Sequence, residues 1–177
     1  MTGAIWDWTE LRDASPRRIM RLIAEVTFPD EKAVTIRDAL VTISDWSSWN
    51  KPSLEFLEKL SDAEAAARLR QIKGVGPKTA AAVLLFSTLR RATLPVDTHY
   101  LRVALRLGLI PPGTSDDSAH ILLRAQLPAN WKPADMERQY YLMKGLGQRF
   151  CTARFPRCPQ CPVRRMCPSG DATPSPD

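Results

Sequence analysis

Four cysteines lie close together near the C-terminal end of this 177-residue sequence. Their pattern is Cys-x6-Cys-x2-Cys-x5-Cys. Thiolates at such short spacing can converge on zinc, which usually takes two Cys-x2-Cys pairs, or on an iron–sulfur cluster, whose larger body suits wider loops. Because only one such pair is present, the spacing favours an iron–sulfur cluster, with zinc as the alternative. The predicted metal ligands are Cys151, Cys158, Cys161 and Cys167.

The residues between these cysteines are basic, and no acidic side chain occurs from residue 151 to residue 170. Some of this positive charge would offset thiolate charge at the metal. An arginine-rich loop that a metal holds rigid could also bind DNA phosphates. The net charge of +6 likewise indicates a polyanionic partner. We therefore predict DNA contacts for Arg154, Arg157, Arg164 and Arg165.

A glycine-containing turn separates two helical segments in the middle of the chain. Its sequence is Lys-Gly-Val-Gly-Pro-Lys-Thr. Glycine lets a partner approach the backbone, and amides at the start of a helix can bind a phosphate. The same residues would also suit an ordinary turn between two helices. If the turn binds phosphate, the predicted contacts are Lys73, Gly74, Val75, Gly76, Lys78 and Thr79.

Lys78 and Asp97 are candidate catalytic residues, although Lys78 would also suit a solvated surface position and Asp97 a plain helix cap. Lys78 follows Pro77 in the first turn of a predicted helix, where the helix dipole disfavours a further positive charge and so favours the nucleophilic amine. Asp97 precedes Thr98 at a position typical of a helix N-cap. A carboxylate can cap a helix and still stabilise positive charge on a substrate, so the two roles are compatible.

Helical periodicity extends over nearly the whole chain, and these helices must position the candidate residues. Helix starts are marked by Ser15 before a proline and by the capping-box residues Ser61 and Glu64. Only the short run 92–96 has strand character, so we predict an all-α fold. The predicted helices span residues 17–26, 30–43, a segment from 53, 62–72, 77–89, 99–107, 118–125 and 134–150.

The predicted domain organisation is simple. Residues 1–150 form one helical domain, which contains the glycine turn and its flanking helices at about 62–89. Residues 151–168 form the metal-binding loop, and the polar, proline-rich residues 169–177 are expected to be a disordered tail.

The glycine turn, the Val-Asp-Thr-His sequence around Asp97 and the cysteine run, in this order, resemble the endonuclease III family of helix-hairpin-helix DNA glycosylases. The resemblance covers about residues 30–168. It implies a helix-hairpin-helix architecture, a 4Fe-4S cluster on the four cysteines, and double-stranded DNA with a damaged base or an abasic site as substrate. It also implies base-excision repair, with oxidised pyrimidines as the expected damaged bases.

The same resemblance assigns roles to the candidate pair. Asp97 would stabilise positive charge on the sugar as the base leaves, and Lys78 would form a Schiff base from which β-elimination nicks the strand. A lysine at this position favours a glycosylase that is also an abasic-site lyase over the adenine-mismatch type.

One departure from the family lies at the N-terminus. Family members usually begin with further helices, and no match to them precedes residue 30. We therefore expect a chain shortened at its N-terminus, and the second hypothesis is a DNA-binding iron–sulfur protein without glycosylase activity. The longest apolar stretch, residues 80–86, is too short to span a membrane, and no signal segment opens the sequence. The expected protein is a cytoplasmic monomer without a membrane partner.

Overall fold

The computed structural model describes residues 7–47 and 49–170. Within these ranges every regular element is a helix, which confirms the all-α prediction. The chain divides between Val75 and Gly76 into two compact units. No helix in the described ranges is long and apolar enough to cross a membrane. From residue 171 onward, the predicted disordered tail lies outside the described residues.

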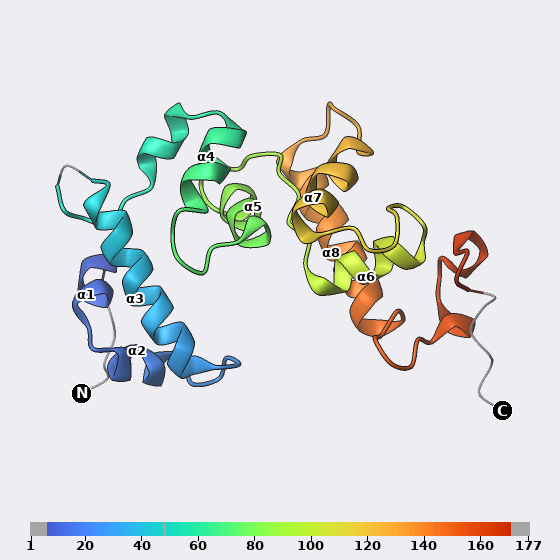
Figure 1. The fold of residues 1–177 in the computed structure, drawn as a ribbon, viewed down its shortest axis with the longest axis horizontal. Coiled ribbons are helices and arrows are strands. Elements are labelled where there is room, and N and C mark those ends of the chain that lie inside the picture. Colours follow the sequence, from blue (N-terminus) through green and yellow to red (C-terminus); the bar gives the residue numbers. More distant parts are fainter. Residues whose placement is uncertain (1–6, 48, 171–177) are drawn as a thin grey trace. The chain divides into compact units, whose positions relative to one another are not determined.

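The first unit is built around its long helix α3. The shorter helices α1 and α2 pack against α3 (Figure 1), and the buried residues Ala14, Ile19 and Ala33 form the core between them. A single 3₁₀ turn, η1, then leads to α4, the helix that precedes the glycine turn. The elements are α1 (Trp8–Asp13), α2 (Pro16–Leu22), α3 (Pro29–Asp45), η1 (Glu55–Lys59) and α4 (Asp62–Leu69).

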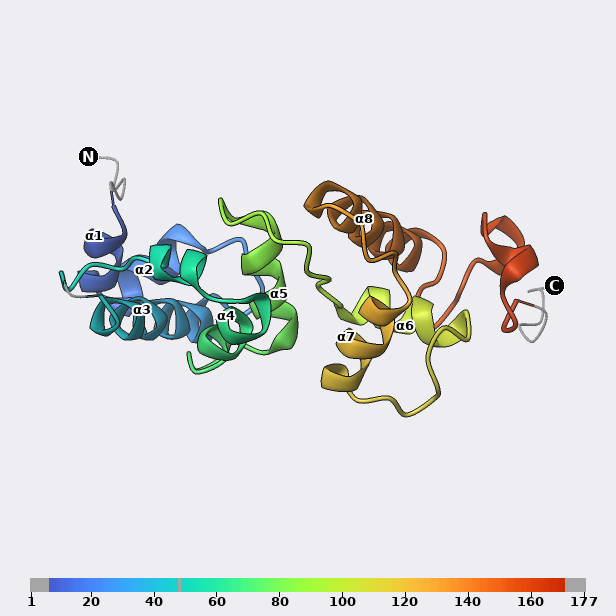
Figure 2. The ribbon, with the colours of Figure 1, turned by 90° about the horizontal axis from the view of Figure 1, so that it is seen from above.

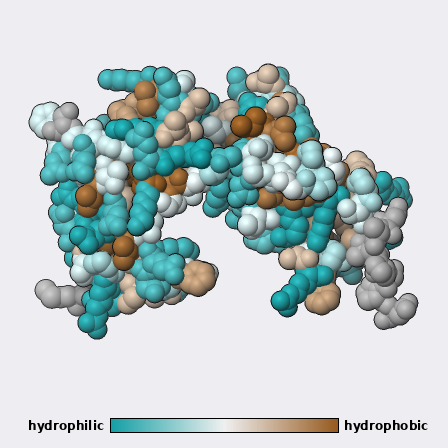
Figure 3. All heavy atoms as spheres, in the orientation of Figure 1, coloured by the Kyte–Doolittle hydropathy of each residue, from teal (hydrophilic) through white to brown (hydrophobic). Residues whose placement is uncertain are grey.

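The second unit holds the remaining helices and the cysteine loop. Helix α6 packs along α8 (Figure 2). Helix α5 contacts both α7 and α8. The core between them includes Tyr100, Val103 and Tyr140, each at most 5% exposed. On the face of the molecule in Figure 3, hydrophilic residues predominate and hydrophobic ones form small separate groups. The elements are α5 (Pro77–Phe86), α6 (Thr98–Arg106), α7 (Asp116–Ala125), α8 (Pro133–Arg149), η2 (Cys158–Gln160) and η3 (Arg164–Met166).

Local capping signals set most helix starts. The observed helix ends differ more from the ends predicted from the sequence. Ser61 and Glu64 form the predicted capping box at α4. The helix expected to reach residue 26 ends at Leu22, and the one expected to reach residue 89 ends at Phe86, because Ser87 adopts an extended backbone. The segment from residue 53 forms only the 3₁₀ turn η1. Helix α1 was not among the predicted elements.

A largely buried extended segment, residues 92–96, leads from α5 into α6. It forms no strand in the described part of the chain, because its polar groups bond to neighbouring helices. The Thr93 hydroxyl donates to the Ala81 carbonyl oxygen at 2.8 Å, and His120 Nδ1–H donates to the Leu94 carbonyl oxygen at 2.9 Å. These hydrogen bonds to α5 and α7 hold in place the segment that leads directly to Asp97.

Gly147 allows α8 to lie against the start of α6. A Cβ atom on Gly147 would lie 2.8 Å from the His99 carbonyl oxygen and 2.9 Å from the His99 Cβ. Both distances are shorter than van der Waals contact, and one of the atoms is backbone. Any side chain at this position would therefore push apart the two helices that carry the candidate site.

We expect Gly147→Ala to destabilise the protein by about 1–3 kcal/mol, because the added methyl overpacks a rigid helix contact. Gly145→Ala is the matched control, since nothing lies within 4 Å of the place that its methyl group would take. That variant should be neutral or more stable by up to about 1 kcal/mol, through helix propensity alone. Urea unfolding of both variants tests the difference, and equal stabilities would show that the helix contact tolerates a side chain.

Candidate active site

Asp97 is the N-cap of α6, as the sequence predicts. Its Oδ1 accepts a hydrogen bond from the Tyr100 amide at 2.8 Å, and its Oδ2 accepts one from the Tyr140 hydroxyl at 3.2 Å. The Asp97 side chain is 13% exposed. The carboxylate is therefore held firmly by donors from α6 and α8, with a small part still open to solvent.

Lys144 is the ammonium group next to this carboxylate. Its Nζ lies 4.0 Å from Asp97 Oδ2 and 5.4 Å from the centre of the Tyr140 ring. Tyr140 and Lys144 are one turn apart on α8, so they share the face that meets the start of α6. The three side chains form a half-buried cluster, which we call the Asp97 cluster: Asp97, Tyr140 and Lys144.

Both α8 members of the cluster titrate above their ordinary ranges. Burial raises the pKa of Tyr140, chiefly by penalising the phenolate. The pKa of Lys144 is also raised, first by its hydrogen bond to Tyr140 and then by the charges around it, including that of Asp97. At neutral pH the cluster therefore contains a phenol and an ammonium.

Lys78 is the second residue of α5 and is exposed, in the same unit as Asp97. Among the described residues no hydrogen bond or ion pair joins Lys78 to Asp97, and the cation at the carboxylate is Lys144 instead. The structure thus leaves the Lys78 amine open to solvent. Its predicted partnership with Asp97 is not formed as a direct contact.

The glycine turn connects α4 and α5. Gly74 has a φ of +85°, a left-handed conformation that residues with a side chain rarely adopt. A Cβ there would also lie 2.9 Å from the Thr35 methyl group. Gly76 is the N-cap of α5 and has ordinary extended backbone. Lys73, Gly74 and Lys78 are exposed, while Val75, Gly76 and Thr79 are partly exposed.

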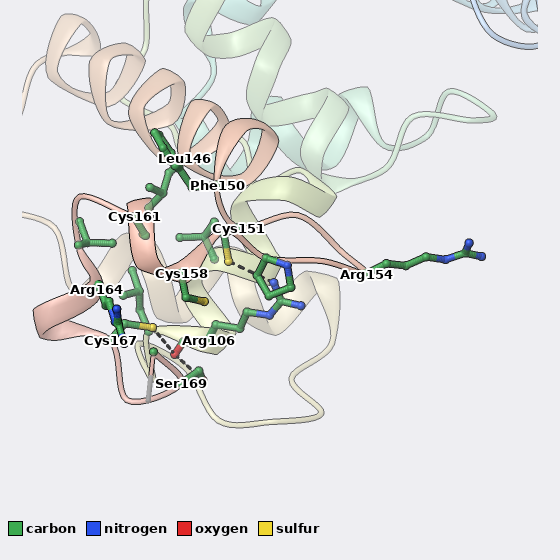
Figure 4. Close-up of a pocket in the computed structure, with 15 residues that line it drawn as sticks. Arg106, Leu146, Phe150, Cys151, Arg154, Cys158, Cys161, Arg164, Cys167 and Ser169 are labelled. Atoms are coloured by element: carbon green, nitrogen blue, oxygen red, sulfur yellow. Dashed lines mark hydrogen bonds between the residues drawn. The ribbon is translucent and has the colours of Figure 1, made fainter. Parts of the chain in front are cut away.

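All four cysteines line one cavity of about 330 Å³ at the end of the second unit (Figure 4). No disulfide joins them in the described chain. In the described ranges, no three cysteine, histidine or acidic side chains are arranged to hold a metal ion together. The thiols therefore surround a space instead of meeting at a point.

Arg106, in α6, forms hydrogen bonds with both ends of the cysteine loop. Its guanidinium donates to Cys151 Sγ at 3.3 Å and to the Thr152 carbonyl oxygen at 2.7 Å. Its own carbonyl oxygen accepts from the Cys167 thiol at 3.4 Å and from the Ser169 hydroxyl at 2.9 Å (Figure 4). A single residue of α6 thus contacts the first and the last cysteine.

The loop arginines predicted to contact DNA are all exposed. Arg154 and Arg164 both contribute to the lining of the cavity. The side chain of Arg154 extends away from the cysteine sulfurs (Figure 4), so its charge is directed to solvent. The exposed set is Arg154, Arg157, Arg164 and Arg165.

Comparison with known proteins identifies the fold and several relatives in sequence. No family model matches the sequence. The sequence is 35% identical over 108 residues to endonuclease III homolog 2, chloroplastic, of Arabidopsis thaliana, covering 57% of this chain and 27% of that protein. The structure matches that of endonuclease III in a non-covalent complex with DNA, with a TM-score of 0.73, 22% identity, and coverage of 95% of this chain and 71% of the other. The chain therefore has the fold of endonuclease III.

This is the helix-hairpin-helix DNA glycosylase fold that the sequence predicts. The sequence is also 26% identical over 175 residues to the DNA glycosylase/AP lyase ROS1 of Arabidopsis thaliana, covering 91% of this chain and 12% of that protein. The chain spans less than half the length of the curated relatives it matches.

Proposed function

We propose that this protein is a base-excision-repair DNA glycosylase with abasic-site lyase activity. The observation that carries the proposal is Asp97, a carboxylate fixed by hydrogen bonds to the Tyr100 amide and the Tyr140 hydroxyl, in the unit that also holds the exposed amine of Lys78. Relatives named as a DNA glycosylase/AP lyase and as endonuclease III homologues support it. Oxidised pyrimidines remain the predicted damaged bases.

The reaction uses the two residues in sequence. The base leaves with the electron pair of the glycosidic bond, and Asp97 stabilises the positive charge that develops on the sugar. The Lys78 amine bonds to the anomeric carbon and loses a proton to solvent. The bond from this carbon to the ring oxygen then breaks, the ring oxygen takes up a proton from solvent to become a hydroxyl, and a protonated imine remains on Lys78. The imine acidifies the neighbouring C–H, whose loss expels the 3′ phosphate and nicks the strand.

For the metal site, a 4Fe-4S cluster on Cys151, Cys158, Cys161 and Cys167 fits better than zinc. A single zinc ion needs its ligands about 2.3 Å away, whereas a cluster is a larger body. The cavity of about 330 Å³ lined by all four cysteines, with no three residues set around one ion in the described ranges, supports the larger group. When bound, the cluster would tie the arginine-bearing loop into one fixed shape.

The glycine turn and the cysteine loop are the proposed DNA contacts. Exposed backbone at Gly74, which follows the exposed Lys73 in the sequence, suits a DNA phosphate. The exposed Lys78, in the first turn of α5, is a further proposed phosphate contact. The exposed loop arginines would hold further phosphates, so DNA affinity should fall steeply with salt. A DNA substrate also favours the predicted cytoplasmic location, and the predicted monomer is the simplest form that fits.

Borohydride trapping on a duplex with one abasic site tests the proposed function, because it does not depend on the identity of the damaged base. Brown, iron-loaded wild-type protein should form a covalent adduct that requires both reductant and abasic site. DNA binding without any adduct would contradict lyase activity and favour the second hypothesis, a DNA-binding iron–sulfur protein without it. A colourless protein with stoichiometric zinc would contradict the cluster.

A further inference from the structure

Lys144 places a positive charge beside the carboxylate that is proposed to stabilise a positively charged sugar. Its Nζ is 4.0 Å from Asp97 Oδ2, the oxygen that also accepts from the Tyr140 hydroxyl. The Lys144 side chain is 33% exposed and that of Asp97 is 13% exposed, so solvent screens the pair only in part. A substrate cation at Asp97 would therefore experience the charge of Lys144 as well.

Asp97 does not need this lysine in order to be oriented. Its Oδ1 is bonded to the Tyr100 amide at the positive end of α6, and its Oδ2 is bonded to Tyr140. Neither of these bonds involves Lys144. The ammonium of Lys144 thus adds a positive charge beside a carboxylate whose orientation is already set by other groups.

Among the described residues, charged groups near the cluster have other partners. Glu137, on α8 one turn before Tyr140, is paired with Arg90 at 2.9 Å. Arg102, on the neighbouring turn of α6, donates to the carbonyl oxygens of Gly147 and Cys151 at 2.8 and 2.7 Å. His99 Nδ1 lies 3.1 Å from the Arg102 guanidinium. Tyr140 and Tyr141 are the remaining groups that interact with the lysine, and the raised pKa of Lys144 indicates that it remains an ammonium.

We propose that Lys144 acts through Asp97 to reduce the negative charge presented to the deoxyribose, and so restricts base release to damaged bases whose glycosidic bonds are already weak. This inference rests on the proposed function. Lys144 is not itself a catalytic residue in it. A transition state with positive charge on the sugar gains less from a carboxylate that an ammonium partly neutralises. Bases that are poor leaving groups, such as the normal bases, would then remain attached.

The charge at the sugar position can be measured by binding, without knowledge of the damaged base. We would compare duplexes with two abasic-site analogues at one position: a cationic pyrrolidine and a neutral tetrahydrofuran. The ratio of their dissociation constants reports the local preference for positive charge. General losses of phosphate affinity or of fold affect both duplexes alike and cancel from the ratio.

Lys144→Met should raise the preference for the cationic duplex by about tenfold, because it removes one charge close to Asp97 while keeping a similar side-chain length. Lys144→Arg should keep the wild-type ratio. Arg138→Met is the matched control: it removes a positive charge from an exposed position on the same helix that has no contact with Asp97 in the described chain.

Two outcomes would contradict the proposal, and they distinguish the role of Lys144 from that of Asp97. In the first outcome, Lys144→Met keeps the wild-type ratio of dissociation constants, while Asp97→Asn loses the preference for the cationic duplex. This result would reject the role of Lys144 and leave the proposed function unaffected. If Asp97→Asn also leaves the ratio unchanged, the carboxylate does not face the sugar, and both the inference and the catalytic role of Asp97 fail.

Discussion

Lys78→Gln is expected to lower strand cleavage at an abasic site about a thousandfold and to remove the borohydride-trapped adduct. A glutamine amide cannot form an imine, so the covalent route is closed. Lys78 is exposed and makes no hydrogen bond or ion pair in the described chain, so the substitution should leave the fold unchanged. Single-turnover nicking of an abasic duplex measures the effect.

Lys73→Gln provides the control for this result, since Lys73 is the other exposed lysine of the glycine turn. It should weaken DNA binding, reduce the slope of log affinity against log salt by about one, and keep the adduct. An adduct that persists in Lys78→Gln would assign the amine to another residue. Loss of the adduct in both variants would indicate that binding alone is being measured.

Asp97→Asn should slow base release about 10²–10³-fold, as expected for loss of one preorganised electrostatic group. Asparagine caps helices about as well as aspartate does, so α6 should keep its start and its contact with the Tyr100 amide. Thermal unfolding should therefore change little while the rate falls. The rate is measured in single turnover on a duplex with an oxidised pyrimidine that the wild type releases.

A different pattern would contradict the role of Asp97. If Asp97→Asn releases the base at the wild-type rate, the carboxylate is only a helix cap. If the rate falls together with a large loss of thermal stability, the effect belongs to the fold. Comparing the two measurements on one protein preparation separates the possibilities.

Helix starts were predictable because their signals are local. Ser61 and Glu64 lie three residues apart, and their reciprocal bonds form within one turn. Helix ends are less clearly marked, and α5 stops at Phe86 because Ser87 and Thr88, which have low helix propensity, follow it. The single 3₁₀ turn η1 likewise reflects packing around Leu57, which is fully buried, and no local sequence signal marks it.

The candidate site was predictable where its residues are close in sequence. The four cysteines lie within one loop, and the structure places all of them on one cavity. Tyr140 and Lys144 were not predicted, although their spacing of four residues indicates that they share a helix face. That this face meets Asp97 depends on the packing of α6 against α8, made possible by Gly147. Arg106 was missed for the same reason, since its partners lie at least 45 residues away.

The most direct test of the proposed chemistry is to identify the residue that becomes attached to DNA. Protein reduced with borohydride on an abasic duplex is digested with protease and nuclease, and the modified peptide is sequenced by mass spectrometry. The exposed amine at the start of α5 predicts that the sugar remnant is attached to Lys78. Attachment at Lys144, or no attachment by iron-loaded protein that binds the duplex, would contradict a glycosylase and lyase that works through Lys78.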